Sequence, residues 1–472
     1  GEPGSDNANF FVRGLGSFGT GQVSPLILID GVESTQNDLA RLQPDDISNF
    51  SVLKDATAAA VYGARGANGI VLVTTKVGES GKTKFGFRAE NTISGNTENF
   101  QFADNITYMK LANQAALTRN ELALPYTQTK IDRTASGTAN PYLYPSNNWI
   151  DQIIKDYTAN QRYNMNVSGG ADKARYYIAG TFNVDNGVYK VDKLNNFNNN
   201  VKLLNYSIRS NVSIQFTKTT KAEIRVYGQF DDYNGPLGGG KQIFQTAIAA
   251  NPVMFPAMFP AEYSKGLKHP MFGNAVVPYI QGSSIGGGLF NNPYALLVQG
   301  YRQENKSNLQ PQVELHQDLE GIIPGLKFRF MGYVQRNSAF SISRGYNPFF
   351  YTASSLDGND ISLTAINPGG PGSLGVTGSE YLSYGEGLKE IRSALYTETA
   401  LNYNRIFKED HSVGAMVVTT MRNSLSGNAG SLELSLPKRN MGVSGRATYG
   451  YKETYLVEFN FGYNGTERFA AT

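Results

Sequence analysis

Apolar and polar side chains alternate with a period of two along most of this chain, and this pattern restricts its fold most strongly. In residues 222–230 one face carries Ala, Ile, Val, Gly and Phe, and the other carries Glu, Arg, Tyr and Gln. Residues 326–334 and 455–461 repeat the pattern. A period of two is typical of β-strands with one apolar and one wet side. It indicates either a soluble sandwich with its apolar face inward or a membrane barrel with that face outward.

The lengths of the connections between strands separate these two architectures. We expect eleven strands, near residues 83–94, 161–170, 174–185, 201–217, 221–233, 302–319, 326–338, 389–405, 411–423, 439–450 and 454–464. Short turns such as 171–173 and 218–220 alternate with long loops such as 95–160 and 234–301. Short turns at one rim and long loops at the other are typical of outer-membrane barrels. A Greek-key sandwich has no reason to alternate so regularly, so the connections favour the barrel.

Composition agrees with a barrel and excludes other classes of protein. Charged residues make up only 17% of the chain, whereas soluble domains carry about 25%. No run of about 18 apolar residues occurs, which excludes a membrane-spanning helix, and a β-barrel needs no such run. The net charge of +3 provides no basic surface for nucleic acid. Because the chain has no cysteine, it has neither disulfides nor thiolate chemistry.

Several short motifs stand in order before the first long strand. Residues 44–76 predict a strand, a short Ala-rich helix at 56–61, a glycine-broken turn and a second strand. The motifs are Val12-Arg13-Gly14, Pro25-Leu26-Ile27-Leu28-Ile29-Asp30-Gly31-Val32, Leu53-Lys54-Asp55 and Tyr62-Gly63-Ala64-Arg65-Gly66-Ala67-Asn68-Gly69. Together they resemble the plug domain of TonB-dependent outer-membrane transporters. The last two motifs resemble the SusC/RagA branch of that family in particular.

The resemblance implies an all-β transmembrane barrel with an N-terminal α+β plug domain inside its lumen. Plugged transporter barrels have about 22 strands, so eleven strands make about half of one. We expect residues 1–78 to form a plug that is incomplete at its N-terminus. Residues 79–472 are expected to form the first half of the barrel, with long extracellular loops. The implied location is the outer membrane of a Bacteroidetes-type bacterium, in contact with lipid.

The resemblance also implies a function, which is TonB-dependent import of an oligomeric nutrient, either a glycan or a peptide. The implied partners are a SusD-like surface lipoprotein that acts as a lid, and TonB. TonB would act through a segment N-terminal to this chain, because the export signal and TonB box that precede a plug in this family are missing. No enzyme activity and no cofactor are expected.

Other functions stay open on the sequence alone. One alternative is a siderophore or cobalamin receptor, but the motifs Leu53-Lys54-Asp55 and Arg65-Gly66-Ala67-Asn68 argue against it. A second is a β-rich surface-binding protein, enzyme or adhesin, which would not need detergent for extraction. A third is a surface receptor that signals through its plug without transport.

Motifs that suggest other chemistry have simpler explanations. Gly63, Gly66 and Gly69 lack the dinucleotide-binding spacing and the following helix, so they are expected to be turn glycines. The run Asp357-Gly358-Asn359-Asp360 lacks the register and closing Glu of a calcium-binding EF-hand. The scattered residues His269, His316 and His411 provide no metal-ligand spacing and no catalytic arrangement.

Two arginines in the plug motifs, Arg13 and Arg65, are candidates for a latch between plug and barrel. An arginine shielded from water requires a paired acceptor, and guanidinium–carboxylate pairs are strong and directional. In the barrel strands, Glu458 and Glu223 fall on polar faces. We therefore expect at least one of the arginines to pair with one of these carboxylates, with Glu458 the first choice.

The long loops are rich in aromatic residues, which indicates a surface for a substrate or for the lid. The candidate contact residues are Phe255, Phe259, Arg344, Tyr346, Phe349, Phe350 and Tyr351. The alternative is that these side chains pack against one another inside the loops. Residues 105–116 are expected to form a helix in the first long loop that serves the same contact.

The alternation also assigns each strand residue to one side of the wall. The residues expected to face lipid are Ile224, Val226, Phe328, Phe330, Val457 and Phe459, and those expected to face the lumen are Glu223, Arg225, Lys327, Arg329 and Glu458. A slip of one residue in the register would reverse every assignment. Arginine at Phe328 is expected to cost about 2–4 kcal/mol if that position lies near mid-membrane.

Overall fold

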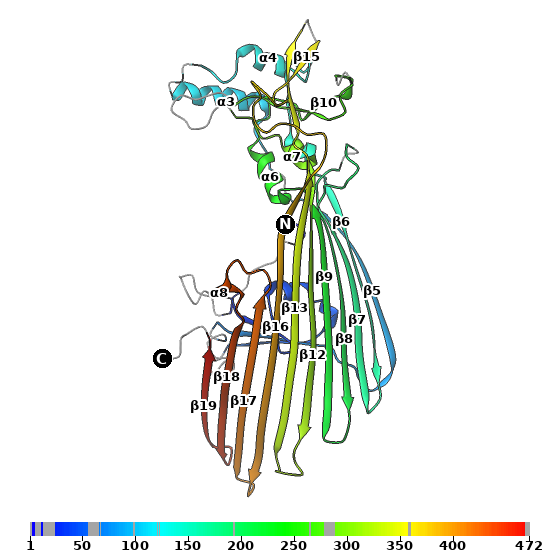
Figure 1. Ribbon diagram of the computed structural model, residues 1–472, viewed down its shortest axis with the longest axis vertical. Helices are drawn as coiled ribbons and strands as arrows, with labels where there is room; N and C mark the ends of the chain where they lie inside the picture. Colours follow the sequence, from blue (N-terminus) through cyan, green and yellow to red (C-terminus); the bar gives the residue numbers. More distant parts are fainter. Residues whose placement is uncertain are drawn as a thin grey trace.

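The chain folds into an open antiparallel sheet of eleven strands that curves around a smaller plug domain and ends in a cap of loops (Figure 1). This computed structural model describes residues 2–4, 11–12, 24–54, 66, 68–97, 100–119, 121, 123–191, 194–263, 266–277, 288–356 and 360–467. The large sheet consists of β5 (Gly81–Gly95), β6 (Tyr157–Gly170), β7 (Ala174–Asn186), β8 (Lys202–Gln215), β9 (Thr220–Gly235), β12 (Gly300–Asp318), β13 (Leu326–Gly345), β16 (Ser383–Phe407), β17 (His411–Ser426), β18 (Lys438–Tyr451) and β19 (Tyr455–Thr466). The strand order follows the chain, with β5 and β19 at the two edges. The expected open arc of eleven strands is confirmed.

The two ends of the large sheet differ as the connection lengths predict. At one end the strands are joined by tight turns (Figure 1). Two of these turns have three residues between the paired strand ends, at 408–410 and 452–454. In each, the first two residues have positive φ, namely Lys408 with Glu409 and Lys452 with Glu453. The long connections all lie at the opposite end.

The paired register places apolar side chains on the outer, convex face of the sheet. On β9, Ile224 and Val226 are 40% and 41% exposed, whereas the side chains of Glu223 and Arg225 are 13% and 15% exposed. The same alternation places Phe328, Phe330, Val457 and Phe459 on the outer face, and Lys327, Arg329 and Glu458 on the inner face. The assignment of both faces from the sequence is therefore confirmed.

Arginine at Ile224 is expected to destabilise the barrel by about 2–4 kcal/mol, the cost near the middle of a bilayer. Ile224 lies between Val212 and Val313 on the neighbouring strands, so its surroundings are apolar on both sides. Phe328 is the third residue of β13, near the short turns, where the same change costs about 0–1 kcal/mol. Urea-driven unfolding of the receptor in lipid vesicles measures both costs. Equal costs at the two positions would contradict this placement of the apolar band.

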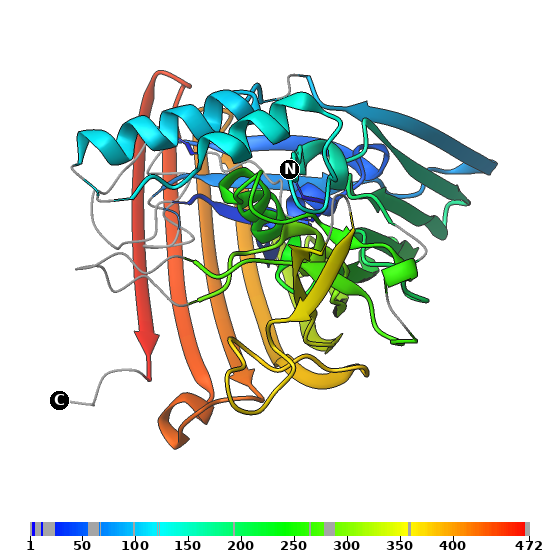
Figure 2. The same ribbon diagram turned by 90° about the horizontal axis from the view of Figure 1, so that it is seen from above.

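The plug is built around a four-stranded sheet in the order β2-β1-β4-β3. The strands are β1 (Leu26–Ile29), β2 (Val32–Ser34), β3 (Ile47–Leu53) and β4 (Ile70–Thr75), with helix α1 (Gln36–Arg41) and the 3-10 turn η1 (Pro44–Asp46) between β2 and β3. The pair of parallel strands, β1 and β4, is apolar on both faces, because Leu28 and Ile70 pack on one side and Ile27 and Val71 on the other. Seen from above, the plug lies inside the curve of the large sheet (Figure 2). The helix expected at 56–61 lies outside the described residues.

The long connections fold together into a cap above the large sheet. We use this name for residues 96–156, 187–201, 236–299 and 346–382. The cap contains α3 (Asn105–Thr118), α4 (Gln128–Ser136), α5 (Trp149–Ile153), α6 (Gly239–Ala249), η3 (Ala261–Tyr263) and α7 (Pro293–Val298), and a second four-stranded sheet of β10 (Met258–Phe259), β11 (Met271–Gly273), β14 (Phe349–Ser355) and β15 (Ile361–Ala365). The helix expected at 105–116 is therefore confirmed as α3. No helix within the described ranges is long and apolar enough to cross a membrane.

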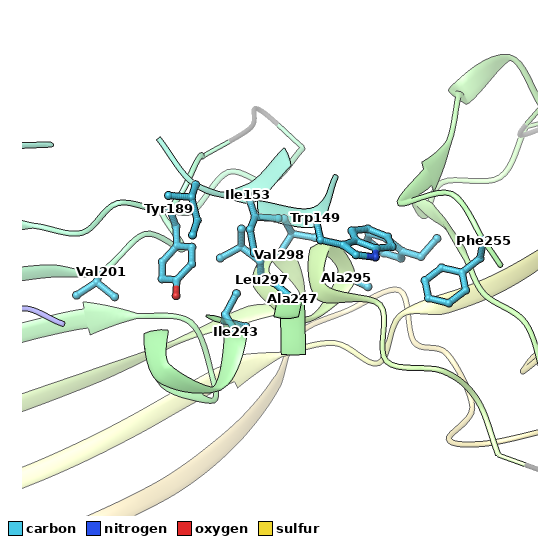
Figure 3. Packing of buried hydrophobic residues seen from close by; sticks show 12 residues of the cluster. Trp149, Ile153, Tyr189, Val201, Ile243, Ala247, Phe255, Ala295, Leu297 and Val298 are labelled. Atoms are coloured by element: carbon cyan, nitrogen blue, oxygen red, sulfur yellow. The ribbon is translucent and has the colours of Figure 1, made fainter. Parts of the chain in front are cut away.

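The cap has a hydrophobic core of its own. Trp149, Tyr189, Ile243 and Phe255 come from three of the long connections and pack together in one cluster (Figure 3). Burying large apolar side chains from distant segments stabilises the loops against one another. The sequence left packing of aromatic side chains inside the loops as an alternative, but it did not predict the sheet that pairs β11 with β14 in parallel.

Candidate functional site at the plug and wall

A buried arginine of the wall holds two carboxylates of the plug. Arg209 lies on the inner face of β8 and is only 5% exposed. Its guanidinium lies 3.6 Å from Asp30 Oδ2 and 3.7 Å from Asp46 Oδ2, measured from Nη1 and Nε respectively. The same guanidinium stacks over the Tyr227 ring, 4.4 Å from its centroid. We call Arg209, Asp30 and Asp46 the clamp. Buried charges are tolerated only when they are paired in this way.

Local structure positions each carboxylate of the clamp. Asp30 and Gly31 have φ angles of 51° and 81° and make the tight turn between β1 and β2, a conformation that an Asp-Gly pair favours. The Asp30 carboxylate accepts hydrogen bonds from Thr75 N at 2.8 Å and from Thr75 Oγ1 at 2.6 Å. Asp46 ends η1 and accepts a hydrogen bond of 2.7 Å from the Tyr177 hydroxyl. Burial raises the pKa of Asp46, although this hydrogen bond and the charge of Arg209 act in the opposite direction.

Amide side chains of the wall hold the backbone of the plug beside the clamp. Asn211, two residues beyond Arg209 on the same face of β8, donates to Thr75 Oγ1 and to the Lys76 carbonyl, at 2.7 Å each. From β12, Gln312 donates to the Asp30 carbonyl at 2.9 Å. The ends of β1 and β4 are therefore bonded to two separate strands of the wall.

Further contacts tie the flanks of the plug to the wall. Glu33 of β2 pairs with Arg422 of β17. On the other side, Arg41 of α1 lies 3.8 Å from Asp231 of β9. An apolar contact adds to these pairs, because Val32 of the plug packs against a cluster of Met331, Tyr333 and Tyr396 on the wall. The described interface thus combines many polar ties with a small apolar patch.

The predicted latch residues do not come together among the described residues. Arg13 and Arg65 lie outside the described residues. Glu458 accepts hydrogen bonds from Arg446 and Asn460, both at 2.7 Å. Glu223 pairs with Arg225 on its own strand, in a wall network with Glu314 and Arg329. The latch as predicted from the sequence therefore stays a prediction.

We expected arginines on the plug to pair with carboxylates on the wall, but most of the described ion pairs have the charges the other way round. The plug supplies Asp30, Asp46 and Glu33, and the wall supplies the arginines. Within the described residues, the pair of Arg41 and Asp231 follows the expected polarity. The sequence contained signals for some members of the clamp, namely an Asp-Gly turn at residues 30–31 and the polar inner face of strand 202–215. It could not indicate which arginine meets which carboxylate, because that depends on how the plug sits in the sheet.

Three of the aromatic residues predicted to contact a substrate or lid are buried in the cap. Phe255 and Phe259 are 1% and 2% exposed. Phe255 stacks against Trp149 and Phe290 in the core shown in Figure 3. Tyr351 is also buried, with its hydroxyl 2.8 Å from His269 Nε2. These three side chains therefore pack inside the loops and present almost no surface to a ligand.

The other predicted contact residues are half-buried. Phe349 stacks on the His269 ring at 3.9 Å between centroids. Tyr346 and Phe350 pack on the edge of the cap core. Arg344 Nη1 donates to the Tyr301 hydroxyl at 3.3 Å. Their contact with a substrate or lid stays a prediction.

A cavity of about 430 Å³ opens at the edge of the cap. His269, Glu380, Asn195 and Tyr346 are among its lining residues. Within the part of the chain that the structure describes, no group of three or more His, Cys, Asp or Glu side chains could hold a metal ion. Residues 357–359 of the Asp-rich turn lie outside that part.

Comparison with known proteins identifies the family. Residues 1–70 match the TonB-dependent Receptor Plug Domain. The TonB-dependent receptor P3 of Formosa agariphila is 25% identical over 463 residues, which cover 94% of this chain and 39% of that protein. Residues 1–70 are a TonB-dependent receptor plug, and 94% of the chain is similar to a TonB-dependent receptor. Receptors of this family are transporters rather than enzymes.

Other relatives support the SusC/RagA branch. The TonB-dependent receptor SusC of Bacteroides thetaiotaomicron is 29% identical over 211 residues, which cover 43% of this chain and 19% of SusC. The structure of the RagAB peptide importer in the "open-open" state superposes with a TM-score of 0.62 at 17% identity, over 98% of this chain and 50% of that one. At this identity the similarity shows the fold alone. The predicted resemblance, the plugged barrel fold and the outer-membrane location are confirmed.

The chain spans less than half the length of the relatives that it matches. The chain covers 39% of receptor P3 and 19% of SusC. Its eleven strands correspond to part of a complete barrel.

Proposed function

We propose that this receptor imports an oligomeric nutrient, a glycan or a peptide, across the outer membrane with energy delivered by TonB. Residues 1–78 act as the plug, and residues 79–472 act as the first half of the barrel wall and its extracellular loops. A SusD-like surface lipoprotein closes over the loops. Pulling on the plug shifts or partly unfolds it and opens a path along the inner face of the wall.

The observation that carries this proposal is the way the plug is held. The clamp and the neighbouring amides join the plug to the wall mainly through polar pairs. Hydrogen bonds and ion pairs fix the plug in one position at rest. When one of them breaks, water can bond to the groups that it leaves. An extensive apolar interlock would instead expose its whole surface when the plug moved. The interface is therefore suited to a plug that is fixed at rest and movable under force.

The cap surface is suited to a protein partner. Helix α3 and its flank expose apolar side chains, including Leu111 at 54% and Leu117 at 61% exposure. Exposed apolar patches on an otherwise folded surface are typical of interaction sites. The half-buried Tyr346 and Phe349 lie in the same cap. We assign this surface to the lipoprotein lid, in keeping with the RagAB complex to which the fold is similar.

Growth on defined oligomers tests the proposed function. A strain that lacks the receptor is expected to lose growth on one class of glycan or peptide, and the intact gene is expected to restore it. A receptor gene whose product lacks the plug strands β1–β4 is expected not to restore energised uptake. Loss of growth at low iron, relieved by a ferric siderophore, would instead support the siderophore alternative. Unchanged growth and uptake of all oligomers in the deletion strain would contradict the proposal.

A further inference from the structure

A second cavity, of about 640 Å³, lies where the plug meets strands β13 to β18 of the wall. The plug contributes Glu33, Ser34, Thr35 and Asp38 to its lining. The wall contributes residues of β13, β16, β17 and β18, and residues 428–436, which include α8 (Leu432–Ser435), cover one side. We call this cavity the plug-side pocket.

The register of the wall gathers three cations in this pocket. Arg422 and Ser424 are neighbours on the inner face of β17, and Ser424 pairs with Lys438 across to β18. Ser426, the next inner residue of β17, pairs with Arg392 of β16. Side chains paired across strands lie about 5 Å apart, and those two residues along a strand lie about 7 Å apart. Arg392, Arg422 and Lys438 therefore form one basic patch.

Carboxylates of both the wall and the plug face this patch. On β16, Arg392 pairs with Glu390 of the same strand. Asp38 caps α1, because its carboxylate accepts hydrogen bonds from Thr35 N at 2.7 Å and Thr35 Oγ1 at 2.8 Å. The Asp38 carboxylate also accepts a hydrogen bond of 3.4 Å from Asn308 Nδ2 of β12. Glu33 reaches across the interface to Arg422. Among the described residues, no ion pair involves Lys438.

The remaining lining is polar and uncharged. Gln335 and Asn337 of β13, Ser424 and Ser426 of β17, and Asn428 supply amides and hydroxyls. Such groups can donate to an anionic oxygen or accept from neighbouring hydroxyl or amide groups of the same ligand. An anion that enters this pocket meets Lys438, which has no ion-pair partner in the described part of the chain, and Arg422, whose partner Glu33 it can replace.

We propose that the plug-side pocket binds an anionic group, a carboxylate or sulfate on the transported oligomer, through Arg422, Lys438 and Arg392. The ligand anion takes the place of the Glu33 carboxylate on Arg422. Because Glu33 lies on β2, which pairs with β1, this exchange removes one tie between the plug sheet and the wall. Binding of the anion thus loosens the plug on the side of β17. This inference rests on the proposed import of an oligomer and adds the charge of the substrate to it.

Binding to the complete detergent-solubilised receptor tests the inference with matched probes. The probes are a hexamer of galacturonic acid and its neutral methyl ester, and a hexapeptide rich in Asp and Glu and its Asn/Gln counterpart. We expect at least one acidic probe to bind about tenfold or more tightly than its neutral partner, as hydrogen bonds to charged groups imply. Its affinity should fall as salt is added, because salt screens charges in a wet pocket. The pair of probes that shows the difference identifies a glycan or a peptide as the source of the anion.

Substitutions within the pocket should act in opposite directions. Arg422→Gln and Lys438→Gln are each expected to weaken binding of the acidic probe about tenfold. Glu33→Gln removes the internal competitor and is expected to tighten binding about threefold to tenfold. Arg439→Gln is the matched control, because Arg439 neighbours Lys438 in the chain but pairs with Glu467 on the opposite face. It should change none of these affinities.

The outcomes separate this inference from the proposed function. If the receptor binds or imports neutral oligomers and the pocket variants change nothing, the anion site is wrong and the import function stands. If Glu33→Gln weakens acidic binding as Arg422→Gln does, the exchange between ligand and plug is wrong. If no probe binds and the cells import no oligomer, both proposals fail.

Discussion

Replacing Arg209 by alanine is expected to destabilise the seat of the plug by about 3–5 kcal/mol, the cost of removing one partner from a buried ion pair. Asp30 and Asp46 would be left near the interior without their counter-charge. The large sheet itself should persist, because its strands pair through their backbones. We expect the plug to become accessible to protease in the resting receptor and the outer membrane to admit large antibiotics. Proteolysis of the purified receptor and antibiotic sensitivity of the cells measure these two effects.

Two further variants separate the clamp from a general effect of removing charge. Arg446→Ala removes an inner-wall arginine that pairs with Glu458, and it should leave the plug protected. Adding Asp46→Asn to Arg209→Ala should restore part of the lost stability, because one unpaired charge disappears. A plug as protected in Arg209→Ala as in the unmodified receptor would show that the clamp does not hold it.

Replacing Phe255 by alanine is expected to destabilise the cap by about 3–5 kcal/mol, the usual cost of deleting a buried aromatic side chain. Its ring lies 5.7 Å from that of Trp149 and 5.8 Å from that of Phe290, between centroids. The cap should loosen while the wall and plug stay folded, since the buried residues of this core all come from the cap, with Tyr233 of β9 packed at its edge. Hydrogen exchange of the segments that contain α6 and α7 measures this loosening.

An exposed aromatic residue of the same loops provides the control. Tyr381 is 76% exposed, so Tyr381→Ala should leave hydrogen exchange in the cap unchanged. If Phe255→Ala also left it unchanged but abolished binding of a lid or substrate, Phe255 would be a contact residue after all. That result would contradict the packing described here.

The sequence by itself determined the wall of this receptor. A period of two places alternate side chains on opposite faces whatever surrounds the strand, so Ile224 and Arg225 could be assigned from local pattern alone. Regular alternation of short and long connections determined which end of each strand carries the loops. The motifs of residues 25–76 were enough to indicate a plug, and the Asp-Gly turn at residues 30–31 is set by local backbone preference.

Only the tertiary structure decided how the plug and the wall meet. Tyr177 and Asp46 are 131 residues apart in the chain, and Arg422 and Glu33 are 389 apart, so no local pattern relates them. An arginine on an inner strand face can pair with any carboxylate within reach, and the position of the plug in the curve selects which one. The same holds for Phe255 and Phe259, whose aromatic rings suit an exposed contact and a buried core equally well. Their place in a core depends on other long loops folding over them, which no single loop sequence specifies.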